Sequence, residues 1–119
     1  VSLHRVGETL RSRSPRARIM FVDYLTLLPP AGTPAPPLPD EVADLGRHVA
    51  ARLAALTAEA ARATGCDVVR AAEASAGHHA WSADPWTIGA GSLLPWKPKP
   101  FRPNAAGMRA VADLVVAQL

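Results

Sequence analysis

The hydrophobic and polar positions along the chain predict three helices. Apolar residues at three- and four-residue steps indicate a short helix over residues 2–13, which ends before Pro15, and another that begins at Asn104. The longest pattern lies between Asp40, a candidate N-cap, and Gly65, a candidate C-cap. The apolar positions behind these predictions are Leu3, Val6 and Leu10; Val42, Leu45, Val49, Leu53, Leu56, Ala60 and Ala63; and Met108, Val111, Leu114 and Val115.

Two short apolar runs between the helices are typical of buried strands. They cover residues 19–22, rich in β-branched and aromatic side chains, and residues 66–71. Residues 29–39 are crowded with proline, which forbids both a helix and a sheet ladder, so we expect an extended loop there. The alternation of helices and strands predicts an α/β fold with a parallel sheet and helices on both faces. Two strands make a poor sheet, which points to a larger domain.

Composition supports the expectation of an incomplete domain. The chain has 119 residues, the length of one domain at most, and its hydrophobic fraction of 49% is rich in Ala, with only 5% aromatic residues. Such side chains supply a thin core for a chain of this length. The sequence also begins at Val1 without an initiator Met. We therefore expect residues 1–119 to form a single partial domain.

Charge and cysteine content exclude several functions at the level of sequence. The net charge is +3, but the basic group formed by Arg11, Arg13, Arg16 and Arg18 has no interleaved aromatic residues, so we predict no nucleic-acid partner. Cys66 is the single cysteine, and alone it builds neither a disulfide nor a metal site. No apolar run approaches the roughly 20 residues that span a bilayer, and no segment is typical of a signal peptide.

Candidate chemistry lies after the predicted strands, because ligands of parallel sheets gather at the carboxyl ends of the strands. Asp23 and Tyr24 follow the first strand, and residues 73–75 follow the second. The long loop that comes next, residues 73–100, has no sustained period, and its three Trp residues indicate that it is ordered. It contains His78, His79 and Asp84, which could serve acid–base or metal chemistry. Adjacent histidines point in opposite directions in an extended chain, so we predict no metal site; backbone hydrogen bonding is the simpler role.

A second candidate is the proline-spaced segment 96–104, which precedes the last helix. A rigid segment of this kind can hold one side chain accurately before a helix N-terminus, and Arg102 occupies that place, with Asn104 as the cap. The alternative is a stiff connection into the helix with Arg102 in solvent. The residues themselves leave both possibilities open.

Residues 100–112, Pro-Phe-Arg-Pro-Asn-Ala-Ala-Gly-Met-Arg-Ala-Val-Ala, resemble the last sequence block of SGNH hydrolases, the GDSL-type serine esterases and lipases. That block reads His-Pro-Asn/Thr-x-x-Gly, and its His is the catalytic base. Residues 77–86 resemble the substrate-side loop of the secreted actinobacterial branch, which reads His-x-Ala-Cys-Ser-x-Asp-Pro-Trp. The resemblance covers nearly the whole chain but only the C-terminal half of the family's domain. It implies a partial three-layer α/β/α domain of the flavodoxin-like type and an ester hydrolase that uses a Ser–His mechanism.

The departures from the family pattern concern catalysis directly. Arg102 stands at the position of the catalytic His, Lys99 stands where many members carry Asp, and the nucleophilic Ser block is absent. The two middle blocks that supply oxyanion donors are also absent. Trp81 replaces the cysteine of the substrate-side loop, and Ala35 lies where its partner is often found. A protonated guanidinium has no acceptor for a serine proton, so we expect the isolated chain to be inactive.

Two functions are compatible with these observations. The first is the C-terminal portion of a serine ester hydrolase, with a small ester or lipid as substrate once an N-terminal half completes the site. It predicts exposed strand edges and apolar helix faces. The second is a non-catalytic binding module derived from the same fold, with a pocket near Trp81, Trp86 and Trp96. The resemblance implies no cofactor and no metal ion, and the substrate loop it marks is His78, His79, Trp81, Asp84 and Trp86.

Overall fold

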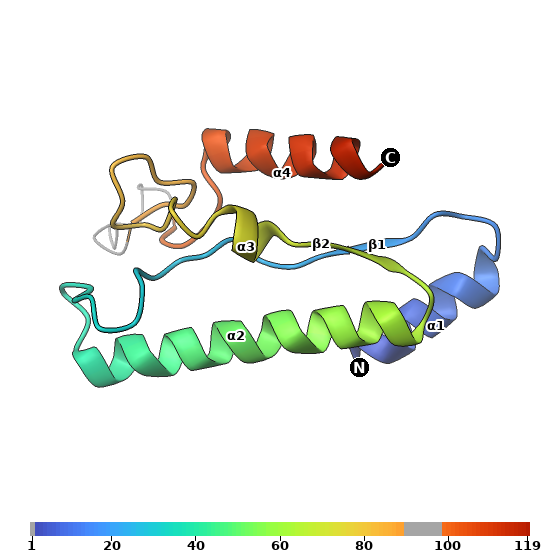
Figure 1. Cartoon of the computed structure of the whole chain (residues 1–119), viewed down its shortest axis with the longest axis horizontal. Helices are drawn as coiled ribbons and strands as arrows, with labels where there is room; N and C mark the ends of the chain where they lie inside the picture. The colour runs from blue at the N-terminus through green and yellow to red at the C-terminus, as the bar shows by residue number, and fades with distance from the viewer. Residues whose placement is uncertain (1, 90–98) are drawn as a thin grey trace.

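The computed structural model describes residues 2–89 and 99–119. Its elements follow the expected order, with one extra helical turn after the second strand (Figure 1). They are α1 (Leu3–Arg13), β1 (Met20–Val22), α2 (Asp40–Ala63), β2 (Asp67–Val69), α3 (Ala71–Ala74) and α4 (Ala105–Gln118). All three predicted helices and both predicted strands are confirmed, but the second strand is shorter than the predicted residues 66–71, because it ends at Val69 and Ala71 begins α3.

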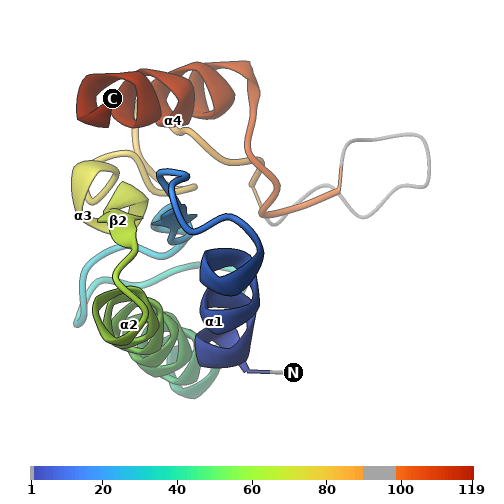
Figure 2. The ribbon, with the colours of Figure 1, turned by 90° about the vertical axis from the view of Figure 1, so that its right-hand side faces the viewer.

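A parallel pair of strands forms the central layer. Phe21 is in register with Val68, and Val22 with Val69. Helices α1 and α2 lie on one face of this pair and α4 lies on the other, which Figure 2 shows from the end of the sheet. The predicted α/β fold with helices on both faces is therefore confirmed. Within the described residues no helix is both long enough and apolar enough to cross a membrane.

Local chemistry sets the ends of the helices. The Ser2 hydroxyl accepts the Arg5 N–H at the start of α1. At the start of α2 the sequence prediction was wrong, because Pro39 is the N-cap residue and Asp40 is the first helical residue, where its charge favours the helix dipole. At the end of α2, Gly65 has φ of 67° and the Cys66 N–H donates to the Ala61 carbonyl over 2.8 Å. This left-handed turn is a Schellman motif and explains why glycine follows the helix.

Small side chains make up most of the core. The buried hydrophobic residues are Leu25, Ala35, Ala43, Ala60, Ala61, Val69 and Ala71. The larger apolar side chains of α2 lie on a different face of the helix from Ala43 and Ala61, and of the buried alanines of α2 only Ala60 shares their face. Val42, Leu45, Val49, Leu53 and Leu56, which we call the α2 stripe, are between 37% and 63% exposed. In α4, Met108 is 65% exposed, so it does not share the partly covered face that carries Val111 and Leu114.

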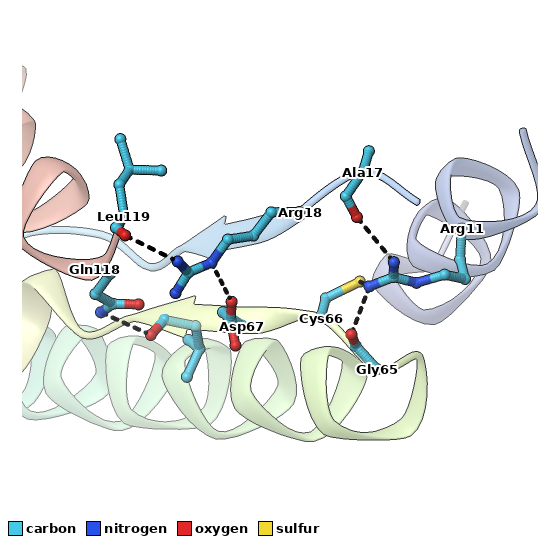
Figure 3. Close-up of polar contacts among 9 residues, drawn as sticks. Arg11, Ala17, Arg18, Gly65, Cys66, Asp67, Gln118 and Leu119 are labelled. Carbon is cyan, nitrogen blue, oxygen red and sulfur yellow. Dashed lines mark hydrogen bonds and ion pairs between the residues drawn. The ribbon is translucent and has the colours of Figure 1, made fainter. Parts of the chain in front are cut away.

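Arginine side chains connect the layers at the amino end of the sheet (Figure 3). The Arg11 guanidinium donates to the carbonyls of Ala17 and Gly65, over 2.9 and 2.5 Å. It therefore joins α1 to the segments that lead into β1 and β2. Arg18 forms an ion pair with Asp67, with 3.0 Å between Nε and Oδ2. Two members of the basic group therefore bind groups of the protein itself.

Candidate functional site

The carboxyl ends of both strands lead into the region where the sequence places its candidate residues. Asp23, directly after β1, accepts the Ala72 N–H through Oδ1 over 2.9 Å and so holds the first turn of α3. Ser75 is completely buried; its hydroxyl accepts the Thr26 N–H and donates to the Ala71 carbonyl. Both side chains are thus occupied with structural hydrogen bonds, which leaves Ser75 no role as a nucleophile.

His78 makes four contacts with Asp84 and Trp86. Its Nδ1 lies 2.8 Å from the backbone oxygen of Asp84 and 3.5 Å from the Asp84 carboxylate. Its ring stacks on the Trp86 indole, with 3.9 Å between centroids and 5° between planes. The backbone N–H of Trp86 donates to the His78 carbonyl, so the two ends of the segment 78–86 are bonded to each other. Because a carbonyl oxygen only accepts, Nδ1 is the donor in the contact with the Asp84 backbone.

His79 has other partners. Its Nδ1 accepts the Trp81 N–H over 3.2 Å, and its carbonyl accepts the Ser82 hydroxyl. The two adjacent histidines therefore take part in separate hydrogen-bond sets. In the part of the chain that the structure describes, no three His, Cys, Asp or Glu side chains gather closely enough to hold a metal ion.

Trp81 connects the loop to the proline-rich segment. Its indole N–H donates to the Pro36 carbonyl over 2.8 Å, and its ring lies 6.2 Å from that of Phe101, centroid to centroid. Ala35, the residue before Pro36, is completely buried. Trp96, the third tryptophan of the predicted loop, lies outside the described residues.

The backbone around Arg102 is fixed from two directions. The Ile88 N–H donates to the Arg102 carbonyl over 2.9 Å, the Phe101 N–H donates to the Ile88 carbonyl over 2.7 Å, and Thr87 forms an antiparallel bridge with Pro103. From the sheet, the Tyr24 hydroxyl donates to the Phe101 carbonyl. Position 102 therefore has a defined place beside the end of β1.

Phe101 adopts an unusual backbone conformation beside this site. Its φ is 63°, in the left-handed region that non-glycine residues seldom occupy. The hydrogen bonds at its own N–H and carbonyl hold it there. A residue kept in this region marks a turn that the surrounding structure overdetermines. The turn presents Arg102 and Lys99 at the surface, and both side chains are exposed.

The start of α4 explains the Asn-x-x-Gly pattern physically. Asn104 caps the helix, as predicted: its Oδ1 accepts the Gly107 N–H over 2.8 Å, and its amide donates to the Pro85 carbonyl over 2.7 Å. The Asn104 N–H bonds to the Trp86 carbonyl. A Cβ at Gly107 would overlap that same carbonyl, so glycine is required for the helix to approach the loop.

The structure thus brings several predicted residues together. His78, Asp84 and Trp86 form one cluster, and the loop that carries them bonds to the segment that carries Arg102. Sequence reasoning missed the bridge between residues 87–88 and 101–103. Neither segment alternates apolar and polar residues, so no strand pattern in the sequence predicts this bridge.

Two shallow hollows lie away from this cluster. One, of about 480 Å³, lies beside β2 and is lined by residues that include Arg62, Cys66 and Gln118. The other, of about 270 Å³, lies on α1 around Val6 and Leu10. Neither is lined by Trp81 or Trp86, so the pocket expected for a binding module does not coincide with either hollow.

Comparison with known proteins shows a similarity among solved structures. Neither protein-family models nor curated protein sequences match the chain. Among solved structures, the chain is similar to phospholipase A1 from Streptomyces albidoflavus NA297, with a TM-score of 0.81 and 21% sequence identity. The chain shares the fold of part of a phospholipase. The match covers 98% of this chain and 49% of the phospholipase, so the chain spans about half of that protein's length.

Proposed function

We propose that this chain is the C-terminal portion of a GDSL/SGNH-type serine ester hydrolase domain of the secreted actinobacterial branch, acting on carboxylic or lipid esters. The observation that carries the proposal is the placement of residue 102. It lies on a braced turn beside the carboxyl end of β1, immediately before a helix capped by Asn104. The family positions its catalytic base in such a place. Likeness of fold to a phospholipase A1 supports the same assignment.

The substrate-side loop supports the proposal through two contacts. The family pattern pairs a loop cysteine with a cysteine near the proline-rich segment; here Trp81 stands at the first position, and its indole bonds to Pro36, the residue after Ala35 at the second. An indole that donates to a backbone carbonyl can connect the same two segments without a disulfide. The stacked pair of His78 and Trp86 gives the loop a rigid wall.

Arg102 accounts for the predicted inactivity of the isolated chain. In the family reaction a serine hydroxyl attacks the ester carbonyl, and the base takes the hydroxyl proton and later passes it to the leaving alcohol. A guanidinium offers only N–H donors, so it accepts no proton at this position. The Ser75 hydroxyl is buried and bonded, and the nucleophile would come from the N-terminal half.

A chain extended at its N-terminus tests the proposal. We expect the reading frame upstream of Val1 to encode a Gly-Asp-Ser block. We also expect the extended polypeptide, once Arg102→His is introduced, to hydrolyse p-nitrophenyl butyrate with sensitivity to a serine-directed organophosphate. Two controls accompany it. One is the extended polypeptide with Arg102 retained, and the other carries Arg102→His but has the Ser of that block changed to Ala; we expect neither to hydrolyse the ester. An upstream frame without the block, or an inert Arg102→His polypeptide, would argue for the non-catalytic binding module instead.

A further inference from the structure

The two outer edges of the sheet differ. On β2, the Val68 carbonyl points away from β1 and accepts the amide of Gln118 at the end of α4 over 3.2 Å, so this outer carbonyl already has a partner. On β1, Ile19 and Asp23 bond to β2 through their carbonyl and N–H respectively. Because backbone groups alternate along a parallel ladder, the N–H and C=O groups of Met20 and Val22 point away from β2. Among the described residues no backbone hydrogen bond uses them, and Val22 is 45% exposed.

The helices on one face determine which kind of strand fits this open edge. Connections between parallel strands of one sheet are right-handed, and α2 makes such a connection from β1 to β2. In Figure 2, α1 lies on the same face as α2, displaced in the direction that runs from β2 to β1. A strand that leads into α1 across this face must then lie next to β1, on the side away from β2. It must also run parallel to β1.

The α2 stripe continues an interface that already exists. One turn beyond Leu56, Ala60 follows the same row of positions and is only 5% exposed. One turn further, Thr64 packs so closely on Gly7 of α1 that a Cβ at Gly7 would overlap its side chain. α1 therefore covers the C-terminal end of the row, and the rest of the row runs on without cover. The occupant of the stripe belongs to the same layer as α1.

We infer that the N-terminal half of the proposed hydrolase domain binds this chain through two continuous surfaces: the open edge formed by Met20 and Val22, and the α2 stripe. The inference rests on the proposed function for the identity of the occupant. Its strand pairs in parallel with β1, and the polypeptide that precedes α1 covers the stripe. The carboxyl end of that strand then lies beside Tyr24 and the braced turn at 101–103, where the nucleophile and residue 102 must meet.

A dimer of this chain would pair the β1 edges in a different direction from the N-terminal half. A two-fold dimer joined through β1 edges pairs the two strands antiparallel, since the axis reverses the strand direction. Such a dimer would protect the same amides without supplying a chain that leads into α1. A second copy would therefore be recognised by a doubled molecular mass and an antiparallel strand beside β1, and the N-terminal half by a parallel strand.

Amide hydrogen exchange in a single-chain fusion tests the inference. In the fusion, the half of the Streptomyces albidoflavus phospholipase A1 that this chain does not cover is placed before Val1. We expect the Met20 and Val22 amides to exchange at least tenfold more slowly than in the isolated 119-residue chain. Unchanged exchange at both amides would overturn the inference. Slow exchange in the isolated chain, accompanied by a doubled mass, would also overturn it, in favour of a second copy.

Matched variants separate the stripe from general effects of charge. Leu45→Lys with Leu53→Lys should abolish the slowing in the fusion. Ala51→Lys with Ala55→Lys, at exposed positions of the same helix, should leave the slowing of amide exchange unchanged. Leu45 and Leu53 are 63% and 55% exposed, so we expect circular dichroism of the isolated variant to match the parent. Equal slowing in both variants would remove the stripe from the interface.

Ester hydrolysis by the fusion carrying Arg102→His distinguishes the two proposals. Slow exchange without hydrolysis would reject the proposed function and keep the surface. Hydrolysis without slow exchange would reject the surface and keep the function.

Discussion

The Tyr24 hydroxyl donates a hydrogen bond of 2.7 Å to the Phe101 carbonyl. This contact joins Tyr24, two residues beyond the end of β1, to the turn that presents Arg102, across 77 positions of sequence. It holds Phe101 in its left-handed conformation together with the Ile88 bond. The end of the sheet thus positions the turn directly.

Tyr24→Phe removes this hydrogen bond and leaves the ring in place. Because the tyrosine is about half exposed, we expect a loss of about 1 kcal/mol in the free energy of unfolding, at the modest end for a hydrogen bond. Urea unfolding followed by circular dichroism measures it. We also expect faster amide exchange at Ile88 and Phe101, with no change at Val69. Exchange rates at Ile88 and Phe101 equal to those of the parent would mean that the hydrogen bonds with Ile88 hold the turn without Tyr24.

Gly107→Ala places a Cβ against the Trp86 carbonyl, and backbone cannot move away as a flexible side chain would. We expect a loss of about 2 kcal/mol, in the range for overpacking a well-packed site. Gly77→Ala is the matched control, because a Cβ there meets nothing within 4 Å. Thermal unfolding of both variants tests the difference. Equal effects of the two substitutions would contradict the close approach of α4 to the loop.

Arg11→Lys keeps the charge but loses the planar fork that reaches two carbonyls. We expect a loss of about 1–2 kcal/mol, since hydrogen bonds to charged groups are stronger than neutral ones. Arg13→Lys, at an exposed position on the same helix, should change stability little. Chemical unfolding of the two variants decides the matter. A neutral Arg11→Lys would show that one carbonyl contact is sufficient.

Arg102→His in the isolated chain should produce no hydrolysis of p-nitrophenyl butyrate above a buffer blank. A base without a nucleophile has no proton to accept, so the first step of acyl transfer is lacking. The exposed position of Arg102 makes the substitution compatible with the fold. Hydrolysis that a serine-directed reagent abolishes would reveal a nucleophile within these 119 residues.

The site could be predicted only in part. The substrate-side loop and the segment around Arg102 were identified as separate candidates from their residue types. Their union depends on hydrogen bonds between Trp86 and Asn104 and between Ile88 and Arg102, which follow from the path of the long loop. Likewise, the spacing of the arginines does not indicate that Arg11 and Arg18 have partners more than 40 positions away.

By itself, the sequence determined the three long helices and the two strands and where most of the helices end, but not the single helical turn α3. These features depend on groups within about four residues of one another, such as Ser2 with Arg5, Gly65 after α2, and Asn104 with Gly107. Only the tertiary structure decided which side of each helix is covered. The apolar spacing of the α2 stripe shows that Leu45 and Leu53 share a face, but burial requires another surface to pack on it. Ala43 and Ala61 lie on another face of α2 and are buried instead, while Ala60 shares the face of the stripe and is buried at the end of α2 that α1 covers.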